Sequence, residues 1–339
     1  MKHVNIPIFI PHLGCPNQCI FCNQRYISGT INFDESSVDK TIEEVLSTVN
    51  DEDECEIAFF GGSFTGIDKD LMVRLLNKAQ GYVDKGKIIG IRMSTRPDYI
   101  NEEIISILKN YTVTFVELGI QSMNDNVLSY LKRGHTSNDT VKAAKLLNNA
   151  SIKFVGQMMV GLPNATIEDE IYTAKAICDL GASGSRIYPT LVFKNTELEV
   201  ITASGQYSPL SIEEAVERTA SLLNVFVKHR VPCIRIGLCE SDNLHSDDTY
   251  LAGPNSPSIG EMVKSRVYRD VIINKLESLK RLSTQALIIE CPSGATSQVV
   301  GNKRQNIIEI KNRYGLKDIK VKENADLMQY QIKIKEKEE

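Results

Sequence analysis

No run of apolar residues in the 339-residue sequence approaches the roughly 18 that are needed to span a bilayer. The apolar stretch near the N-terminus, Val4 to Pro11, lacks the length and the small-residue cleavage site of a signal peptide. Hydrophobic residues make up 42% and charged residues 24% of the chain, and the mean hydropathy is -0.17, which excludes a disordered or fibrous protein. We therefore expect a globular, cytoplasmic protein that does not enter membranes.

The net charge of -4 is unevenly distributed along the chain. From Glu261 to the end there are 16 Lys and Arg against 11 Asp and Glu, so this part carries +5. Residues 1–260 hold 23 basic against 32 acidic residues and carry -9. Contacts with phosphate groups are therefore expected near the C-terminal end.

Short β-rich apolar segments alternate with helical patterns as far as Gly237. Strands are expected at 4–10, 55–60, 87–93, 113–119, 153–160, 186–189 and 233–237. Helices are expected at 35–48, 69–83, 102–108, 124–131, 138–149, 167–180 and 212–229. Strands that alternate with helices indicate a parallel sheet with right-handed crossovers.

Polar signatures follow or end several successive strands rather than one pair of strands. They are GGSFTG at 61–66, STRPD at 94–98, ELGIQS at 117–122 and GLP at 161–163. A doubly wound sheet concentrates its site at one switch point, whereas a β/α barrel draws functional residues from many strand ends. The sequence therefore favours the barrel.

The alternation stops after Gly237. A polar loop at 240–260 leads to a helix at about 261–282, and a last unit reads as strand 285–291, a helical stretch broken at Gly301, and strands 318–323 and 328–335. We expect a barrel core at 1–240, a loop and connecting helix at 241–283, and a small basic α+β domain at 284–339.

Three of the eight cysteines, Cys15, Cys19 and Cys22, form a C-x3-C-x2-C array directly after the first strand. Clustered cysteines in a cytosolic chain indicate metal or thiol chemistry rather than disulfides. A structural zinc site normally has four ligands, and no fourth cysteine or spaced histidine pair lies nearby. Three thiolates suit a [4Fe-4S] cluster with one iron left open. Zinc, or simply buried free thiols, is the alternative.

This array resembles that of the radical S-adenosylmethionine (SAM) superfamily. The resemblance implies an α/β fold, a partial (β/α)6 barrel of the TIM type, with a [4Fe-4S] cluster and SAM as cofactors. It also implies an electron donor of the flavodoxin or ferredoxin type. One electron would split SAM into methionine and a 5'-deoxyadenosyl radical, and that radical would abstract hydrogen from a substrate.

The resemblance also implies which residues contact SAM. Gly61, Gly62 and Ser63 resemble the family's site for the methionine amine, with Ser63 in place of an acid. Further contacts are implied for Ser94, Thr95, Arg96, Glu117, Gln121, Arg133 and Gln157. Read without the resemblance, the same segments are a glycine turn, a helix N-cap and a cation at a helix C-terminus.

Residues 186–199, together with RGHT at 133–136 and GLP, resemble the radical-SAM core of Elp3, which modifies the wobble uridine of tRNA. The coproporphyrinogen oxidase branch fits less well. The Elp3 resemblance covers about residues 5 to 240, and no residues remain for the acetyltransferase domain of Elp3. It places Tyr188 at the barrel mouth. Cys239 is either a buried thiol or a group that exchanges a hydrogen atom, and Tyr188 and Cys239 are the candidate catalytic residues.

The basic segment at 298–321 faintly resembles a KH module, although Arg304 stands where the second glycine of the GxxG loop is expected. Its candidate RNA contacts are Lys303, Arg304, Lys311 and Arg313, and the alternative is a solvated helix face. Three functions follow from the sequence: an enzyme that modifies RNA, an enzyme acting on a small molecule or peptide, or a non-catalytic iron–sulfur protein.

Overall fold

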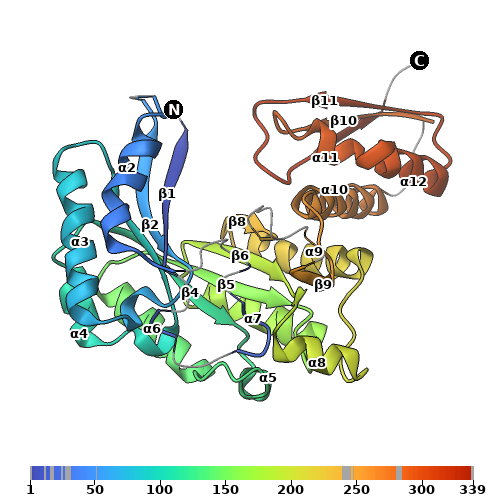
Figure 1. Cartoon of the computed structure of the whole chain (residues 1–339). Coiled ribbons are helices and arrows are strands. Elements are labelled where there is room, and N and C mark those ends of the chain that lie inside the picture. The colour runs from blue at the N-terminus through green and yellow to red at the C-terminus, as the bar shows by residue number, and fades with distance from the viewer. Residues whose placement is uncertain are drawn as a thin grey trace.

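The computed structural model describes residues 2–10, 13–15, 19–23, 26, 32–50, 52–238, 246, 248–279 and 285–336. Seven strands form one sheet in the order β1-β2-β3-β4-β5-β6-β8, and every neighbouring pair is parallel. Their bounds are β1 His3–Phe9, β2 Glu54–Phe60, β3 Gly90–Thr95, β4 Val113–Gln121, β5 Phe154–Val160, β6 Gly184–Pro189 and β8 Cys233–Ile236. The sheet curls into a half-barrel, which stays open because strands β1 and β8 lie at opposite edges and do not pair (Figure 1). The expected barrel class is confirmed, with one strand more than six.

Helices alternate with these strands and border the sheet (Figure 1). They are α2 Val38–Leu46, α3 Lys69–Asp84, α4 Glu102–Leu108, α5 Asp125–Tyr130, α6 Ser137–Asn149, α7 Ile167–Asp179, α8 Glu197–Ala203 and α9 Ile212–Lys228. The largest core lies between helices and strands, where Leu75 and Leu147 pack with Ile57 and Leu118. At β5, Gly156 leaves room for Ile177 of α7, because a Cβ there would lie 2.6 Å from its Cγ2.

Two local features were not expected from the sequence. Helix α8 follows β6, and a two-stranded antiparallel pair joins β7 Val192–Phe193 to β9 Tyr250–Ala252. Segments of two and three residues are too short to show a period. The last strand was expected from 328 but begins at Lys333, because the chain turns at Tyr330, whose φ is 62°.

The C-terminal part adds a second, smaller sheet of order β11-β10-β12. Strand β10 (Ala286–Cys291) pairs parallel with β11 (Asp318–Glu323) and antiparallel with β12 (Lys333–Glu336). Helices α10 (Ile259–Ser278), α11 (Thr296–Val300) and α12 (Gln305–Tyr314) cover one face of it. In Figure 1 these helices lie between the small sheet and the barrel.

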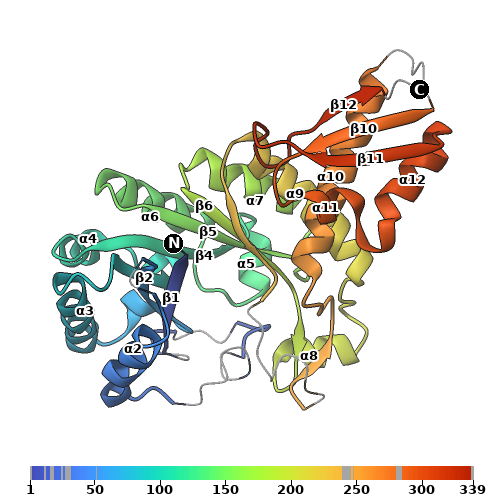
Figure 2. The same cartoon turned by 90° about the horizontal axis from the view of Figure 1, so that it is seen from above.

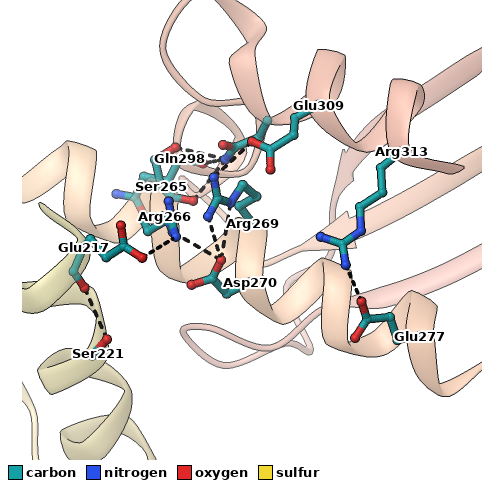
Figure 3. Close-up of polar contacts among 11 residues, drawn as sticks. Glu217, Ser221, Ser265, Arg266, Arg269, Asp270, Glu277, Gln298, Glu309 and Arg313 are labelled. Atoms are coloured by element: carbon teal, nitrogen blue, oxygen red, sulfur yellow. Dashed lines mark hydrogen bonds and ion pairs between the residues drawn. The ribbon is translucent and has the colours of Figure 1, made fainter. Parts of the chain in front are cut away.

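Helix α10 belongs to both cores. Val263 and Val267 pack with Ala215 and Leu223 of α9, whereas Ile272 and Leu276 pack under the small sheet. Ion pairs reinforce both contacts (Figure 3), with Arg266 Nη2 3.2 Å from Glu217 Oε1 on α9 and Arg269 Nη1 3.0 Å from Glu309 Oε2 on α12. The small sheet is therefore attached to the barrel through one shared helix.

Within the described residues, no helix is both long and apolar enough to cross a membrane.

A buried ion pair lies between α7 and α9. Glu170 is 3% exposed and receives two hydrogen bonds from Arg218, at 2.7 and 2.9 Å, and one from the Gly161 amide at 2.7 Å. Burial raises the pKa of Glu170, while Gly161 and Arg218 oppose this shift.

We predict that Arg218→Met lowers the free energy of unfolding by about 3 to 5 kcal/mol, because Glu170 is left buried without its counter-charge. In the variant the folded-state pKa of Glu170 lies above its unfolded value, so stability is retained at acidic pH and lost as the pH rises through that pKa. Urea unfolding at several pH values measures both effects.

Arg74→Met is the matched control, because Arg74 and Glu35 form an exposed ion pair in the same barrel. Its cost should stay below about 1 kcal/mol. Equal costs for the two variants would contradict the role assigned to the buried pair.

Candidate functional site

A cavity of about 1140 Å³ lies inside the half-barrel, at the carboxyl ends of its strands. It brings together nearly all of the residues singled out from the sequence. The lining includes Cys15, Cys19, Cys22, Gly61, Gly62, Ser94, Thr95, Arg96, Glu117, Gln121, Arg133, Gln157 and Tyr188. Ser63 does not line it, and Cys239 lies outside the described residues.

The three cysteines lie on one wall of the cavity and form no disulfide with a described residue, with Cys19 only 7% exposed and the other two half-buried. Backbone hydrogen bonds hold their segment, because Ile20 N donates to Leu131 O at 3.2 Å and Leu198 N donates to Ile20 O at 2.8 Å. Among the described residues, no three Cys, His, Asp or Glu side chains are already arranged as a metal site. The donor chemistry nevertheless fits an iron–sulfur cluster, since all three sulfurs face one cavity.

Two glycines bring the cysteine segment against the turn that follows β2. A Cβ on Gly62 would lie 2.5 Å from Leu13 O and 2.6 Å from Ile10 O, and a Cβ on Gly14 would lie 2.3 Å from Ser63 O. Gly14 also has a φ of 71°, which favours glycine. The Gly-Gly pair was expected to let the backbone approach a ligand closely. In the structure, Gly62 closely approaches the backbone of the segment that carries the cysteines.

Ser63 does not have the position that was expected for a cofactor contact. Its side chain is fully buried, where Oγ accepts a hydrogen bond from Arg96 N at 2.9 Å and lies 3.2 Å from Thr95 Oγ1. Thr65 Oγ1 lies 2.6 Å from the same Thr95 oxygen. Ser63 therefore fixes the end of β3 and presents Arg96, instead of facing the cavity.

Two arginines stand beside the thiols. Arg133 Nη1 lies 3.5 Å from Cys19 Sγ, and its Nη2 donates to Gly119 O at 2.9 Å. Arg96 is buried in a bidentate pair with Asp98, with bonds of 2.9 and 2.7 Å. Burial raises the pKa of Cys15, while Arg133 and then Arg96 lower it. The two guanidinium groups therefore partly offset the effect of burial on the pKa of the Cys15 thiol.

The cavity wall contains buried polar atoms that lack a hydrogen-bond partner among the described residues: Arg96 Nη1, Gln121 Oε1 and Arg133 Nε. Gln121 sits at a register shift between β4 and β5 with a φ of 65°. Gly119 makes room for this arrangement, since a Cβ there would lie 2.7 Å from Arg133 Nη2. Buried groups of this kind normally have a partner, so donors and an acceptor are available here for a polar ligand.

Beneath these groups a belt of buried charges crosses the inner face of the sheet. Glu117 is 0% exposed and accepts hydrogen bonds from Arg92 at 3.2 Å, Arg186 at 2.6 Å and Gln157 Nε2 at 2.6 Å. Arg92 also pairs with Glu56 at 2.9 Å. Glu117 was expected to contact the cofactor, but here its carboxylate holds Gln157 and Arg186 in place.

Sequence reasoning did not identify Glu56, Arg92 and Arg186 as part of this site. A signal was present, because each is a charged residue inside an otherwise apolar strand. A charge in a strand buried on both faces must point toward a polar interior.

The fold and the cavity define an open β/α-barrel protein with a thiol-lined ligand site between its strand ends. Residues 9–177 match the model of the Radical SAM superfamily, and residues 182–269 match the Radical_SAM C-terminal domain. The chain belongs to the radical SAM superfamily, whose members are enzymes.

Several curated relatives are about 30% identical to the chain over the residues that align with it. An uncharacterized protein of Methanocaldococcus jannaschii is 29% identical over 258 residues, which cover 72% of this chain and 77% of that protein. The tRNA uridine(34) acetyltransferase of the same organism is 30% identical over 55% of this chain and 38% of its own length. Elongator complex protein 3 of Saccharomyces cerevisiae is 30% identical over 50% of this chain and 34% of its own length. The chain thus spans little more than a third of these two named relatives.

Solved structures show the same fold. Elp3 of Methanocaldococcus infernus superimposes with a TM-score of 0.62 at 23% identity, covering 79% of this chain and 63% of that chain. SuiB of Streptococcus suis, solved with S-adenosylmethionine bound, gives a TM-score of 0.51 at 11% identity, covering 71% of this chain and 51% of that chain.

We predict that Gly62→Ala reduces the iron bound after anaerobic reconstitution several-fold without unfolding the barrel. The added methyl group displaces the backbone at Leu13 and Ile10, and with it the cysteine segment. Iron and sulfide analysis together with circular dichroism tests this. Gly81→Ala is the control, because a Cβ there meets nothing within 4 Å. Full iron content in Gly62→Ala would show that the loop does not need this close contact.

Proposed function

We propose that the chain is a radical SAM enzyme in which Cys15, Cys19 and Cys22 hold a [4Fe-4S] cluster and the substrate is an RNA. The observation that carries the cofactor assignment is the convergence of three cysteines and two arginines on one cavity. The superfamily implies both the cluster and SAM.

Each part of the cavity has a role in this proposal. When bound, the cluster supplies the electron that splits SAM into methionine and a 5'-deoxyadenosyl radical. Arg133 through Nε and Arg96 through Nη1 bind the SAM carboxylate, because these two nitrogens have no partner among the described residues. Gln121 Oε1 accepts from a ribose hydroxyl.

The remaining lining residues position and shield the reactants. Ser94, Thr95, Gly61 and Gly62 form the wall at the ends of β3 and β2. Glu117 orients Gln157 and Arg186, and Arg186 Nη1 donates to the Tyr188 hydroxyl at 3.2 Å. Tyr188 therefore stands on the substrate side of the cavity, and Cys239 remains a candidate for hydrogen-atom exchange. The apolar lining residues Ile20, Phe21, Leu191 and Phe193 exclude water.

An RNA substrate is supported by the names of two relatives, a tRNA uridine(34) acetyltransferase and Elongator complex protein 3. The chain covers too little of either to carry over acetyl transfer. Of the four expected phosphate contacts, Arg313 is paired with Glu277 at 2.6 Å (Figure 3), and Lys311 is half-buried. Lys303 and Arg304 are exposed on the turn between α11 and α12, and these two remain phosphate contacts in the proposal. A flavodoxin or ferredoxin type protein would supply the electron.

We predict that Cys19→Ala abolishes both the cluster and the formation of 5'-deoxyadenosine, because a cluster held by two thiolates is not retained. Iron analysis and chromatography of the nucleoside products measure the two losses, and circular dichroism should show an intact barrel. Cys178→Ala is the matched control, since Cys178 lies on α7 outside the cavity and burial raises its pKa to about 11. SAM cleavage that persisted in Cys19→Ala would refute the ligand assignment.

We further predict that the reconstituted enzyme, given SAM and a strong reductant, forms more 5'-deoxyadenosine with cellular RNA than without it. RNA isolated from cells grown in deuterated medium should transfer deuterium to that product, as mass spectrometry would detect. Ribonuclease treatment of the RNA should remove both effects. Stimulation by the small-molecule fraction, resistant to ribonuclease, would instead indicate a small-molecule substrate.

A further inference from the structure

The small sheet has one face that no described helix covers. On the covered face Leu287, Ile289 and Cys291 of β10 pack against the helices, together with Ile319 of β11 and Ile334 of β12. Successive side chains of a strand point to opposite faces. The alternate residues therefore form the open face, which is seen from above in Figure 2. They are Ala286, Ile288 and Glu290 on β10, Asp318, Lys320 and Lys322 on β11, and Lys333 and Lys335 on β12.

The strand register places a lysine on each side of both central residues. Ile288 pairs with Lys320 of β11 and with Lys335 of β12. Glu290 pairs with Lys322 on one side and Lys333 on the other. Two rows of the face therefore have a lysine at both ends, and a third row pairs Ala286 with Asp318. We call the four lysines with Ile288 and Glu290 the lysine face.

The lysine face is positive. Its four lysines oppose Glu290 within the two rows and Asp318 in the neighbouring row, which leaves a charge of +2. Glu290 is engaged by Lys335 and by Asn324 Nδ2 at 2.9 Å. Lys320, Lys322 and Lys333 are exposed, and none of them forms an ion pair with a described residue. Three cations with free ammonium groups thus share one flat surface.

We propose that the lysine face binds the phosphate backbone of RNA, an inference that rests on the proposed action on RNA. Lysines on edge strands also discourage aggregation, but that purpose does not require all four to share one face. Phosphates spaced along a strand match cations spaced along a sheet, and each contact releases a condensed counterion.

Other partners fit this surface less well. An anionic membrane surface is bound by cations together with large apolar side chains that enter the lipid. Among the described residues of this face, Ile288 is the only large apolar side chain, beside the small Ala286. Protein interfaces concentrate their binding energy in aromatic and arginine side chains, and the lysine face has neither. RNA is therefore the occupant that charge and shape favour.

The position of the lysine face defines what it does. The covering helices lie between the small sheet and the barrel, so the face points away from the barrel (Figure 1). The RNA segment that it binds is consequently not the nucleotide that enters the cavity. Binding there anchors a large RNA and lowers its KM without contributing to the reaction itself.

The test uses the full-length, reconstituted enzyme and fluorescently labelled bulk tRNA as the probe. Fluorescence anisotropy at several salt concentrations gives the affinity and its salt dependence. For Lys320→Gln/Lys322→Gln/Lys333→Gln we expect at least a tenfold loss of affinity and a salt slope reduced by about 2 to 3, because each lost contact removes about 0.7 to 0.9 from the slope. The KM for RNA should rise, while kcat and SAM cleavage without RNA stay unchanged.

Lys109→Gln/Lys142→Gln/Lys145→Gln is the matched control. It removes the same charge from exposed lysines of the barrel and should change the affinity less than twofold. If the two triple variants bind tRNA equally well, or if only Lys303→Gln/Arg304→Gln weakens binding, the lysine face is not the RNA surface.

Further outcomes separate this inference from the proposed function. A wild-type enzyme that cleaves SAM but has no salt-sensitive affinity for tRNA would overturn both the lysine-face inference and the RNA substrate, and leave the cofactor assignment standing. Binding to phosphatidylserine vesicles that depends on the three lysines, with tRNA binding unaffected, would overturn the inference alone.

Discussion

The cysteine segment reaches the cavity only because its backbone can approach the turn after β2 within distances that no side chain permits. Gly14 and Gly62 face each other's loops at this contact, and the amide of Ser63 donates to Leu13 O at 3.2 Å. The rest of the site depends on this contact, because it fixes the position of the cysteine sulfurs relative to β2 and β3. Ser63 connects this contact to the end of β3, because its side chain hydrogen-bonds with Thr95 and with the Arg96 amide.

The half-barrel also needs a means of filling its interior without apolar layers. A closed β/α barrel is packed by branched apolar side chains, whereas this sheet leaves a cavity for ligands. Glu117 accepts hydrogen bonds from Arg92, Arg186 and Gln157, so the charges of the belt compensate one another. Removing one partner of such a buried network costs far more than the network itself contributes to stability. The belt therefore specifies how neighbouring strands align beneath the site.

Much of the barrel and of the cavity could be predicted from sequence, because both depend on local signals. Strands β2 and β5 are mostly apolar, with Glu56 and Gln157 as polar residues inside them, and the cysteine array and RGHT carry their own spacing. Interactions between residues that are distant in sequence could not be predicted in this way. Ser63 was expected to face a ligand, but its hydroxyl pairs with Thr95, which is 32 positions away. Neither spacing nor composition reports which of two faces such a side chain takes.

The lysine face is a second feature that could not be predicted from local sequence signals. The excess of basic residues after Glu261 is visible in the composition, and the faint resemblance to a KH module indicates Lys303, Arg304, Lys311 and Arg313 as the RNA contacts. The lysines of β11 and β12 come together only through pairing with β10, and β12 begins later than its apolar pattern indicates. Charge patches built across strands require the register, which is a tertiary property.

Helix α10 connects the barrel to the small C-terminal sheet, because it packs against both. Half of its apolar residues are buried against α9 and half beneath the small sheet, and so its apolar positions surround the helix instead of forming one stripe. A continuous helix of 20 residues with both ends packed transmits position more rigidly than a flexible linker does. An RNA held on the lysine face is thereby kept at a fixed distance from the cavity. A rigid offset of this kind selects RNAs by size and shape, because only a molecule long enough to span both surfaces can occupy them together.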